Sequence, residues 1–110
     1  MLRIRVRLES SGLLAEVDAE GHAGFARRGR DIVCAAATLL LRTVARTFEG
    51  DSGYIVEGSA ESRGRLHFSV RPATGTDTDW GKGVTEMFVK GIDDLSREFP
   101  KHIELTISND

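Results

Sequence analysis

The hydrophobic pattern of this chain of 110 residues changes repeatedly between two periods, and this change constrains its fold more than any other feature. Residues 2–8 and 13–19 alternate apolar and polar side chains, which predicts two half-buried strands joined by a turn. Residues 32–48 and about 79–99 instead carry apolar side chains at helical spacing, which predicts two amphipathic helices. The strand period returns in three further segments, at residues 54–60, 65–70 and 103–107.

The resulting order is strand, strand, helix, strand, strand, helix, strand. It predicts an α+β fold with an antiparallel-rich sheet of about five strands and two helices packed on one face. No linker composition divides the chain, so we expect a single domain over residues 1–110. The apolar positions that we expect the second helix to bury follow the helical period: Trp80, Val84, Met87, Phe88, Ile92, Leu95 and Phe99.

Composition limits the possible partners and the compartment. Fifteen basic and seventeen acidic residues give a net charge of −2, which does not favour a polyanion, and direct nucleic-acid binding is therefore not expected. The first residues alternate apolar and charged side chains, unlike a signal peptide, and the longest apolar run is too short to span a membrane. A single cysteine excludes an internal disulfide. We expect a cytoplasmic protein with a free thiol.

Residues 21–34 hold the side chains with the most reactive chemistry. Gly21, Gly24 and Gly29 predict a mobile loop, and Asp31 stands where an N-cap residue is expected. Cys34 would then be the third residue of the first helix. Unpaired N–H groups and the helix dipole stabilise an anion at this end of a helix, and the thiolate is the nucleophilic form of cysteine.

His22 is the candidate base for this thiol. A neutral imidazole can take the thiol proton near neutral pH and return it to a leaving amine. Asp31 either orients the imidazole or serves only as a helix cap. On pattern alone, a buried inert cysteine and a histidine in a turn remain alternatives.

A metal or cofactor site is not expected. His22 and Cys34 lack the close ligand pairs of zinc sites, and His67 and His102 lie in unrelated segments. The glycines of the loop match neither phosphate-binding fingerprint.

Two short motifs carry a resemblance to a known family. The tripeptide Gly21-His22-Ala23, followed after the loop by Gly29-Arg30-Asp31-Ile32-Val33-Cys34-Ala35-Ala36, resembles the signature of the ribosomal-processing cysteine proteases, the Prp family. The sharp identity is confined to residues 21–39, and length and element order extend the resemblance to the whole chain. The one departure is Thr38, where a serine is common, and it retains the hydroxyl.

The resemblance implies a small homodimeric cysteine protease with Cys34 as nucleophile, His22 as general base and acid, and Asp31 in a supporting role. Its implied reaction is removal of the N-terminal extension of bacterial large-subunit ribosomal protein twenty-seven during ribosome assembly. Such a peptide could add a strand to an exposed sheet edge. The alternative is a non-enzymatic ribosome- or RNA-associated binding module that contacts phosphates through Arg27, Arg28 and Arg30.

Overall fold

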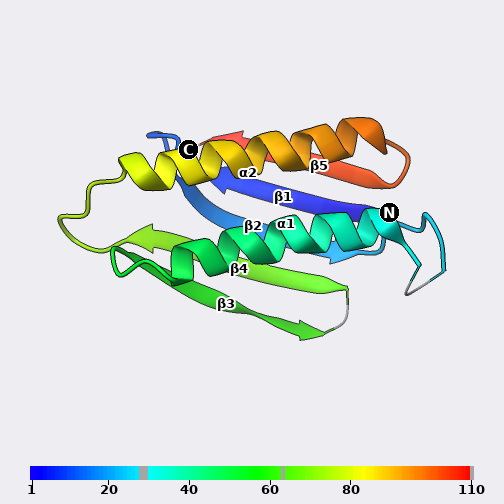
Figure 1. Cartoon of the computed structure of the whole chain (residues 1–110), viewed down its shortest axis with the longest axis horizontal. Coiled ribbons are helices and arrows are strands. Elements are labelled where there is room, and N and C mark those ends of the chain that lie inside the picture. The colour runs from blue at the N-terminus through cyan, green and yellow to red at the C-terminus, as the bar shows by residue number, and fades with distance from the viewer. Residues whose placement is uncertain (28–29, 63, 110) are drawn as a thin grey trace.

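Five strands and two helices follow one another along the chain in the order that the hydrophobic pattern predicts (Figure 1). The computed structural model describes residues 1–27, 30–62 and 64–109. Neither helix in this described part has an apolar stretch of the length needed to cross a membrane. The elements are β1 (Leu2–Leu8), β2 (Leu14–Gly21), α1 (Ile32–Glu49), β3 (Tyr54–Ser62), β4 (Arg65–Pro72), α2 (Asp79–Glu98) and β5 (Ile103–Asn109).

The strands form one sheet in the order β3-β4-β2-β1-β5. Strand β2 pairs antiparallel with β1 and with β4, and β4 pairs antiparallel with β3. Strand β5 instead pairs parallel with β1, because α2 carries the chain back along the sheet before β5 begins. The predicted α+β class is therefore confirmed, with a sheet that is mixed rather than purely antiparallel.

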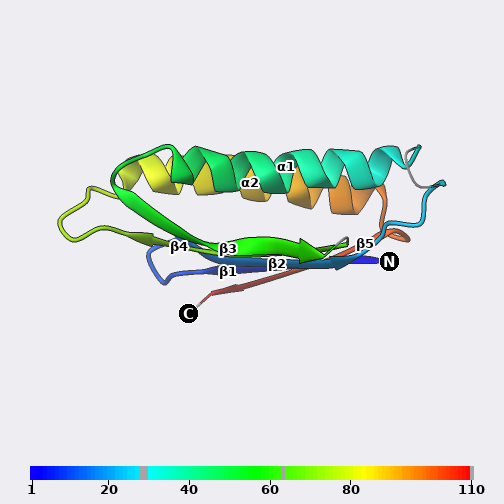
Figure 2. The same ribbon diagram turned by 90° about the horizontal axis from the view of Figure 1, so that it is seen from below.

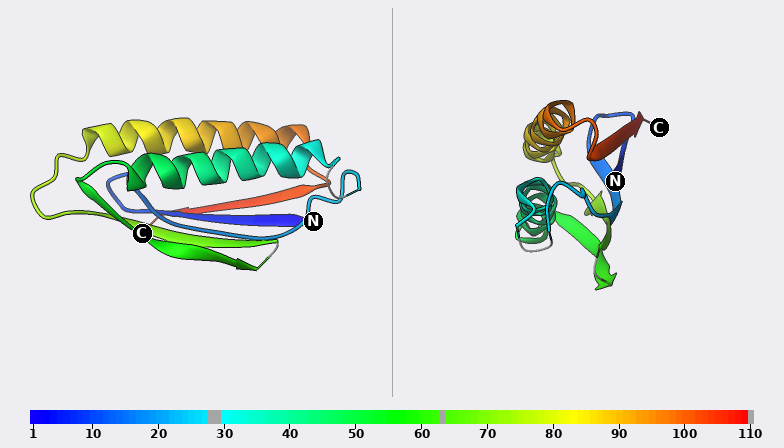
Figure 3. Two further views of the ribbon diagram at one scale, coloured as in Figure 1. Left: turned by 60° about the horizontal axis from the view of Figure 1, so that its bottom comes forward. Right: turned by 90° about the vertical axis from the view of Figure 1, so that its right-hand side faces the viewer.

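Both helices cover the same face of the sheet, as the edge-on view in Figure 2 and the end view in Figure 3 show. The core lies between these two layers. Ile4, Val17, Phe48 and Ile92 are fully buried there, and they come from β1, β2, α1 and α2. The alternation of the first strand is thereby confirmed, since its apolar side chains face the helices and its arginines face away.

The opposite face of the sheet carries a network of ion pairs. Arg5 Nη1 lies 3.1 Å from Asp18 Oδ2, and Arg65 contacts Asp18 at 3.3 Å and Glu20 at 2.9 Å. His67 Nε2 lies 3.1 Å from Glu16 Oε2. Exposed pairs of this kind contribute only about 0–1 kcal/mol each, so their main effect is that positive and negative charges neutralise each other on this face.

Helix α2 packs on a narrower stripe than the sequence predicts. Its buried residues are Gly81, Thr85, Phe88 and Ile92, whereas Met87 is 79% exposed and Trp80 is 45% exposed. The expectation that Met87 faces the core is wrong, because successive helical residues are about 100° apart and its neighbour Phe88 is the buried one. The half-exposed Trp80 ring does pack edge-on against the buried Phe48, with a centroid distance of 5.8 Å. A Cβ at Gly81 would lie 2.7 Å from Tyr54 Cζ, so the close contact between α2 and Tyr54 requires a glycine at this position.

The buried hydroxyl of Thr85 joins α2 to the sheet. Its Oγ1 accepts a hydrogen bond from the Leu14 N–H at 3.0 Å and donates one to the Gly81 carbonyl at 2.8 Å. We expect Thr85→Val to lower the free energy of unfolding by about 1–3 kcal/mol, because the variant keeps the shape but leaves the Leu14 N–H without its acceptor. Urea denaturation measures this loss.

The matched control is Thr85→Ser, which retains the hydroxyl and removes one methyl group. It should lose clearly less stability than Thr85→Val. Equal stabilities of wild type and Thr85→Val would show that this hydroxyl does not join the two layers.

Candidate active site

The start of helix α1 is held by the carboxylate of Asp31. Asp31 is the N-cap residue, and its Oδ1 accepts from the Cys34 N–H at 2.9 Å. Its second oxygen, Oδ2, accepts from the Phe25 N–H at 3.1 Å. One carboxylate therefore binds both the first turn of the helix and the loop that precedes it.

Hydrogen bonds from backbone N–H groups keep the carboxyl group of Asp31 ionised. Burial raises the pKa of the carboxyl, but N–H groups of Cys34, Phe25, Ala26 and Val33 together outweigh it and hold the pKa below the ordinary value of 3.8. Asp31 is therefore ionised at neutral pH and keeps its negative charge beside the cysteine.

The loop is also docked onto the far end of α2. The ring of Phe25 packs edge-on against Phe99 and His102, with centroid distances of 5.5 and 5.4 Å. His102 Nδ1 lies 2.9 Å from the Ala23 carbonyl oxygen, to which it donates. The sequence pattern placed His102 in an unrelated segment, and it gave no signal that the turn after α2 supports this loop.

His22 directly precedes the docked Ala23 and follows the last residue of β2. Two glycines with positive φ shape its surroundings, Gly21 at 95° and Gly64 at 78°. Their backbones are joined, since the Gly21 N–H donates to the Gly64 carbonyl at 2.8 Å. A Cβ at Gly64 would lie 2.8 Å from His22 Nε2, so the imidazole sits against this glycine at the turn between β3 and β4.

Cys34 and His22 face one groove. The groove has a volume of about 700 Å³, runs along α1, and is lined by both side chains together with Asp31, Thr38, Leu39, Arg42 and Arg46, among others. A second hollow of about 450 Å³ lies between α1 and the ends of β2 and β4, and it also contains Cys34, His22 and Thr38. The sequence pattern gave no functional prediction for Arg42 and Arg46, the two arginines of this helix.

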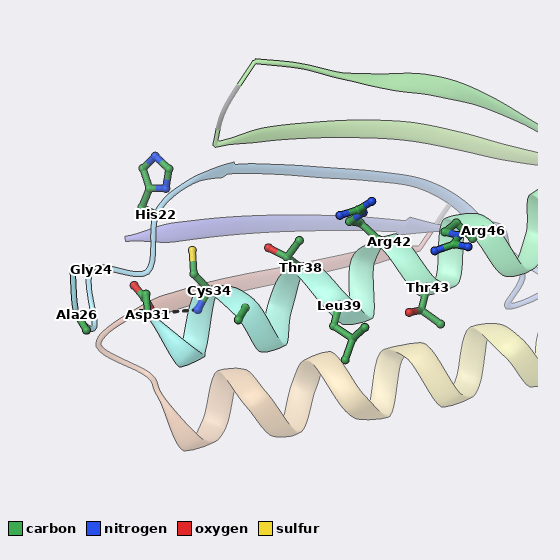
Figure 4. Close-up of a pocket in the computed structure, with 11 residues that line it drawn as sticks. His22, Gly24, Ala26, Asp31, Cys34, Thr38, Leu39, Arg42, Thr43 and Arg46 are labelled. Atoms are coloured by element: carbon green, nitrogen blue, oxygen red, sulfur yellow. Dashed lines mark hydrogen bonds between the residues drawn. The ribbon is translucent and has the colours of Figure 1, made fainter. Parts of the chain in front are cut away.

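The imidazole and the thiol share the groove without being hydrogen-bonded. Figure 4 shows the Cys34 side chain projecting to the side of α1 on which His22 lies, with the imidazole ring directed away from the sulfur. No hydrogen bond links His22 to another residue in the described ranges. The Asp31 carboxylate does not contact the imidazole either, and both of its oxygens accept from backbone groups.

The remaining predicted residues have simpler positions. Gly24 lines the groove. Arg27 and Arg30 are exposed in the loop, whereas Arg28 and Gly29 lie outside the described residues. His, Cys, Asp and Glu side chains of the described part form no group of three or more that could hold a metal ion.

Fold and groove together define a class of protein: a small α+β protein with a thiol in the first turn of a helix and an imidazole on the same groove. The sequence matches the family model described as Cysteine protease Prp over residues 1–104. The chain therefore belongs to this family of cysteine proteases. No match to the sequence is found among curated proteins.

Solved structures share the fold. The chain is similar to the essential ribosomal processing protease Prp from S. aureus in complex with a covalently linked product peptide, with a TM-score of 0.82 and 20% identity over 97% of this chain and 99% of that chain. A complex of the S. aureus protease with a substrate peptide has a TM-score of 0.75 and 19% identity, over 97% and 99% of the two chains. A protein from Streptococcus mutans has a TM-score of 0.76 and 24% identity, over 100% and 96% of the two chains.

The Asp31 cap gives a pH dependence with a defined sign. Because its folded-state pKa lies below 3.8, the ionised carboxylate stabilises the fold above the unfolded-state pKa, and this stabilisation is lost as the pH falls through the lower folded-state value. We expect Asp31→Asn to be less stable than wild type at about pH 7 by about 0.3–1 kcal/mol, the range for a negative charge at a helix N-terminus, with a difference that shrinks toward about pH 2.5. Urea denaturation midpoints of wild type and Asp31→Asn, measured between these two pH values, test this prediction. A difference that is independent of pH would contradict the role of the charge.

His102 should act on the loop more than on the whole fold. We expect His102→Ala to increase the rate of trypsin cleavage after Arg27 or Arg30 about three- to fivefold, while the free energy of unfolding changes by less than about 1 kcal/mol, because the half-buried imidazole holds the loop by one hydrogen bond and one edge-on contact with Phe25. His102→Asn is the matched control, since its amide can still donate to the Ala23 carbonyl. Unchanged trypsin cleavage in His102→Ala would contradict this docking.

Proposed function

We propose that this protein is a ribosomal processing protease that removes the N-terminal extension of large-subunit ribosomal protein twenty-seven. The observation that carries the proposal is the placement of Cys34 and His22 on one open groove in a chain of the Prp family. The S. aureus protein of this fold is described as an essential ribosomal processing protease, with structures that contain a product or a substrate peptide. In this proposal the whole chain, residues 1–110, forms the catalytic domain.

In the proposed reaction Cys34 is the nucleophile and His22 the general base and acid. The imidazole takes the thiol proton, and the sulfur attacks the carbonyl carbon of the scissile peptide bond. As the C–N bond breaks, the protonated imidazole gives its proton to the leaving amine, and a thioester remains on Cys34. His22 then takes a proton from water, which attacks the thioester and releases the new carboxyl terminus.

This reaction requires the imidazole to turn from its place against Gly64 toward the sulfur. In this proposal the turn takes place about the side-chain bonds of His22, because hydrogen bonds of Gly21 and Ala23 hold the backbone on both sides of it. Peptide entering the groove would favour this rotation by filling the space beside Gly64. The reactive pair is then assembled only when substrate is present.

Asp31 has a supporting role in this proposal. Its carboxylate occupies the Cys34 N–H, a group that in other thiol enzymes can stabilise an oxyanion. In this arrangement Asp31 holds the backbone of Cys34 and the backbone of the loop at fixed positions relative to each other. It does not contact the imidazole, so it supports the site through the backbone.

The same proposal includes the partners and the location. We propose a homodimer that acts in the cytoplasm, where ribosomes are assembled, on an extended peptide. Two exposed edges of the sheet, β3 and β5, are available for a further strand. Sedimentation of the purified protein tests the dimer.

The cleavage test uses a peptide of about twenty residues from the N-terminus of ribosomal protein twenty-seven of the same organism. We expect Cys34→Ala and His22→Ala each to lower the initial rate at least about 10³-fold, since each removes one member of a coupled proton and acyl transfer. Mass spectrometry of the products identifies the cleaved bond. Cleavage by Cys34→Ala at the wild-type rate would refute the proposal.

The matched control is His67→Ala, which removes a histidine on the opposite face of the sheet. It should cleave within about twofold of wild type. The RNA-binding alternative makes a separate prediction. It requires binding to a ribosomal RNA fragment that weakens steeply with salt and survives Cys34→Ala.

A further inference from the structure

Two N–H groups at the start of α1 are already occupied by Asp31. The Cys34 N–H donates to Asp31 Oδ1 at 2.9 Å, and the Ala35 N–H donates to the Asp31 carbonyl oxygen at 3.0 Å. When the Cys34 sulfur attacks a carbonyl carbon, the carbonyl oxygen becomes negatively charged and needs hydrogen-bond donors. The ionised carboxylate beside Cys34 adds to this need, because it repels a second negative charge. Another donor on the groove is therefore required.

Gly24 carries a backbone donor that the protein leaves free. The next residue, Phe25, donates its N–H to Asp31 Oδ2 at 3.1 Å. The Gly24 N–H, by contrast, has no acceptor within the described part of the chain. Gly24 is exposed and lines the groove together with Cys34 and His22. Figure 4 shows it at the same end of the groove as Cys34 and Asp31.

The direction of this N–H follows from the hydrogen bond of His102. His102 Nδ1 donates to the Ala23 carbonyl at 2.9 Å, so this carbonyl points toward the turn after α2. The peptide bond between Ala23 and Gly24 is trans, and in a planar trans peptide the C=O and the following N–H point in opposite directions. The Gly24 N–H therefore points away from His102, toward the groove that Gly24 lines and His102 does not.

His102 is itself fixed by its backbone. Its N–H donates to the Phe99 carbonyl at 3.0 Å, and its own carbonyl accepts from the Leu2 N–H at 3.0 Å. The residue that it holds, Ala23, is only 2% exposed. The peptide between Ala23 and Gly24 is thus held on one side by the core and by His102, so the orientation of the Gly24 N–H is set before a ligand binds.

The space beside Gly24 is open to a ligand. Gly24 has a φ of 70°, which favours glycine, and a Cβ built on it would meet no atom within 4 Å. Without a side chain, the backbone N–H can approach a carbonyl oxygen closely. A fixed donor at an open position is the arrangement that stabilises a developing negative charge at low cost in reorganisation.

Resting on the protease function proposed above, we propose that the Gly24 N–H is an oxyanion donor and that His102 is the positioning residue that aims it. The Cys34 sulfur forms a bond to the carbonyl carbon, one electron pair of the C=O bond moves to the oxygen, and the Gly24 N–H donates to that oxygen. When the C=O bond forms again, the bond to the leaving amine breaks and the amine takes the proton from His22. The Gly24 N–H keeps its own hydrogen throughout.

Two reactions of the same thiol test the donor without peptide cleavage. In acylation by p-nitrophenyl acetate, the sulfur attacks the ester carbonyl, the carbonyl oxygen becomes negatively charged, and p-nitrophenolate leaves. In alkylation by iodoacetamide, the sulfur displaces iodide from a CH₂ group and no carbonyl oxygen gains charge. Loss of an oxyanion donor slows acylation and leaves alkylation unchanged. Loss of thiol reactivity slows both.

The Gly24 N–H can be removed by semisynthesis. Cys34 is the only cysteine, so a synthetic segment 1–33 can be ligated to residues 34–110 at this position. An ester bond between Ala23 and residue 24 replaces the N–H by oxygen. We expect acylation of the folded ester protein to be at least about tenfold slower and kcat for the ribosomal-protein peptide to be about 10²-fold lower. Alkylation should stay within about twofold of wild type.

The matched control is replacement of Gly24 by D-alanine in the same ligated protein. It retains the N–H, and a D residue adopts the φ of 70° without strain. This protein should acylate, alkylate and cleave within about twofold of wild type.

Recombinant variants of His102 test the positioning role. We expect His102→Ala to slow acylation about three- to tenfold, the change that corresponds to loss of one hydrogen bond. His102→Asn should restore acylation to within about twofold of wild type, because its amide can still donate to the Ala23 carbonyl. Alkylation should be unchanged in both variants. An ester carbonyl accepts hydrogen bonds more weakly than an amide, so the ester protein must lose more than His102→Ala.

The outcomes separate this inference from the protease activity. Slow acylation with unchanged alkylation in the ester protein supports the donor even where no peptide is cut. Peptide cleavage at the wild-type rate by the ester protein overturns the donor and leaves the protease function standing. Equal slowing of acylation and alkylation overturns it, as does an ester effect no larger than that of His102→Ala. Slow acylation in Thr38→Val, with normal acylation of the ester protein, assigns the donor to the hydroxyl and also overturns it.

Discussion

The relation between the loop and the first helix depends on one carboxylate. Asp31 accepts from Cys34 in the helix and from Phe25 in the loop, so a displacement of either segment disturbs the other. Hydrogen bonds to an ionised acceptor are shorter and stronger than neutral ones, and here they act at the point where helix N–H groups lack partners. His22 begins the loop and Cys34 lies in the first turn. The carboxylate therefore sets the distance between base and nucleophile without contacting the base.

Local sequence pattern accounts for the elements and for the thiol at a helix start. The alternation in residues 2–8 and the helical spacing after Asp31 are short-range signals, and each corresponds to an observed element. The direction of β5 is different, since it depends on which strand the chain joins after α2. The burial of Gly81 in α2 likewise depends on a contact between distant segments, since it packs against Tyr54.

The supporting residues of the site escaped prediction for the same reason. His102 reaches Ala23 across 79 positions of sequence, and Gly64 meets His22 only because β4 pairs with β2.

The docking of the loop on the segment after α2 has a consequence for the biogenesis of the protein. Phe25 and Ala23 rest on Phe99 and His102, and β5 pairs with β1 from the opposite end of the chain. Contacts between such distant segments form late in folding, because closing the long intervening loop costs entropy first. While the chain is being synthesised, residues 99–109 emerge from the ribosome after the loop and after β1. The loop that follows His22 therefore lacks its support until these residues have emerged.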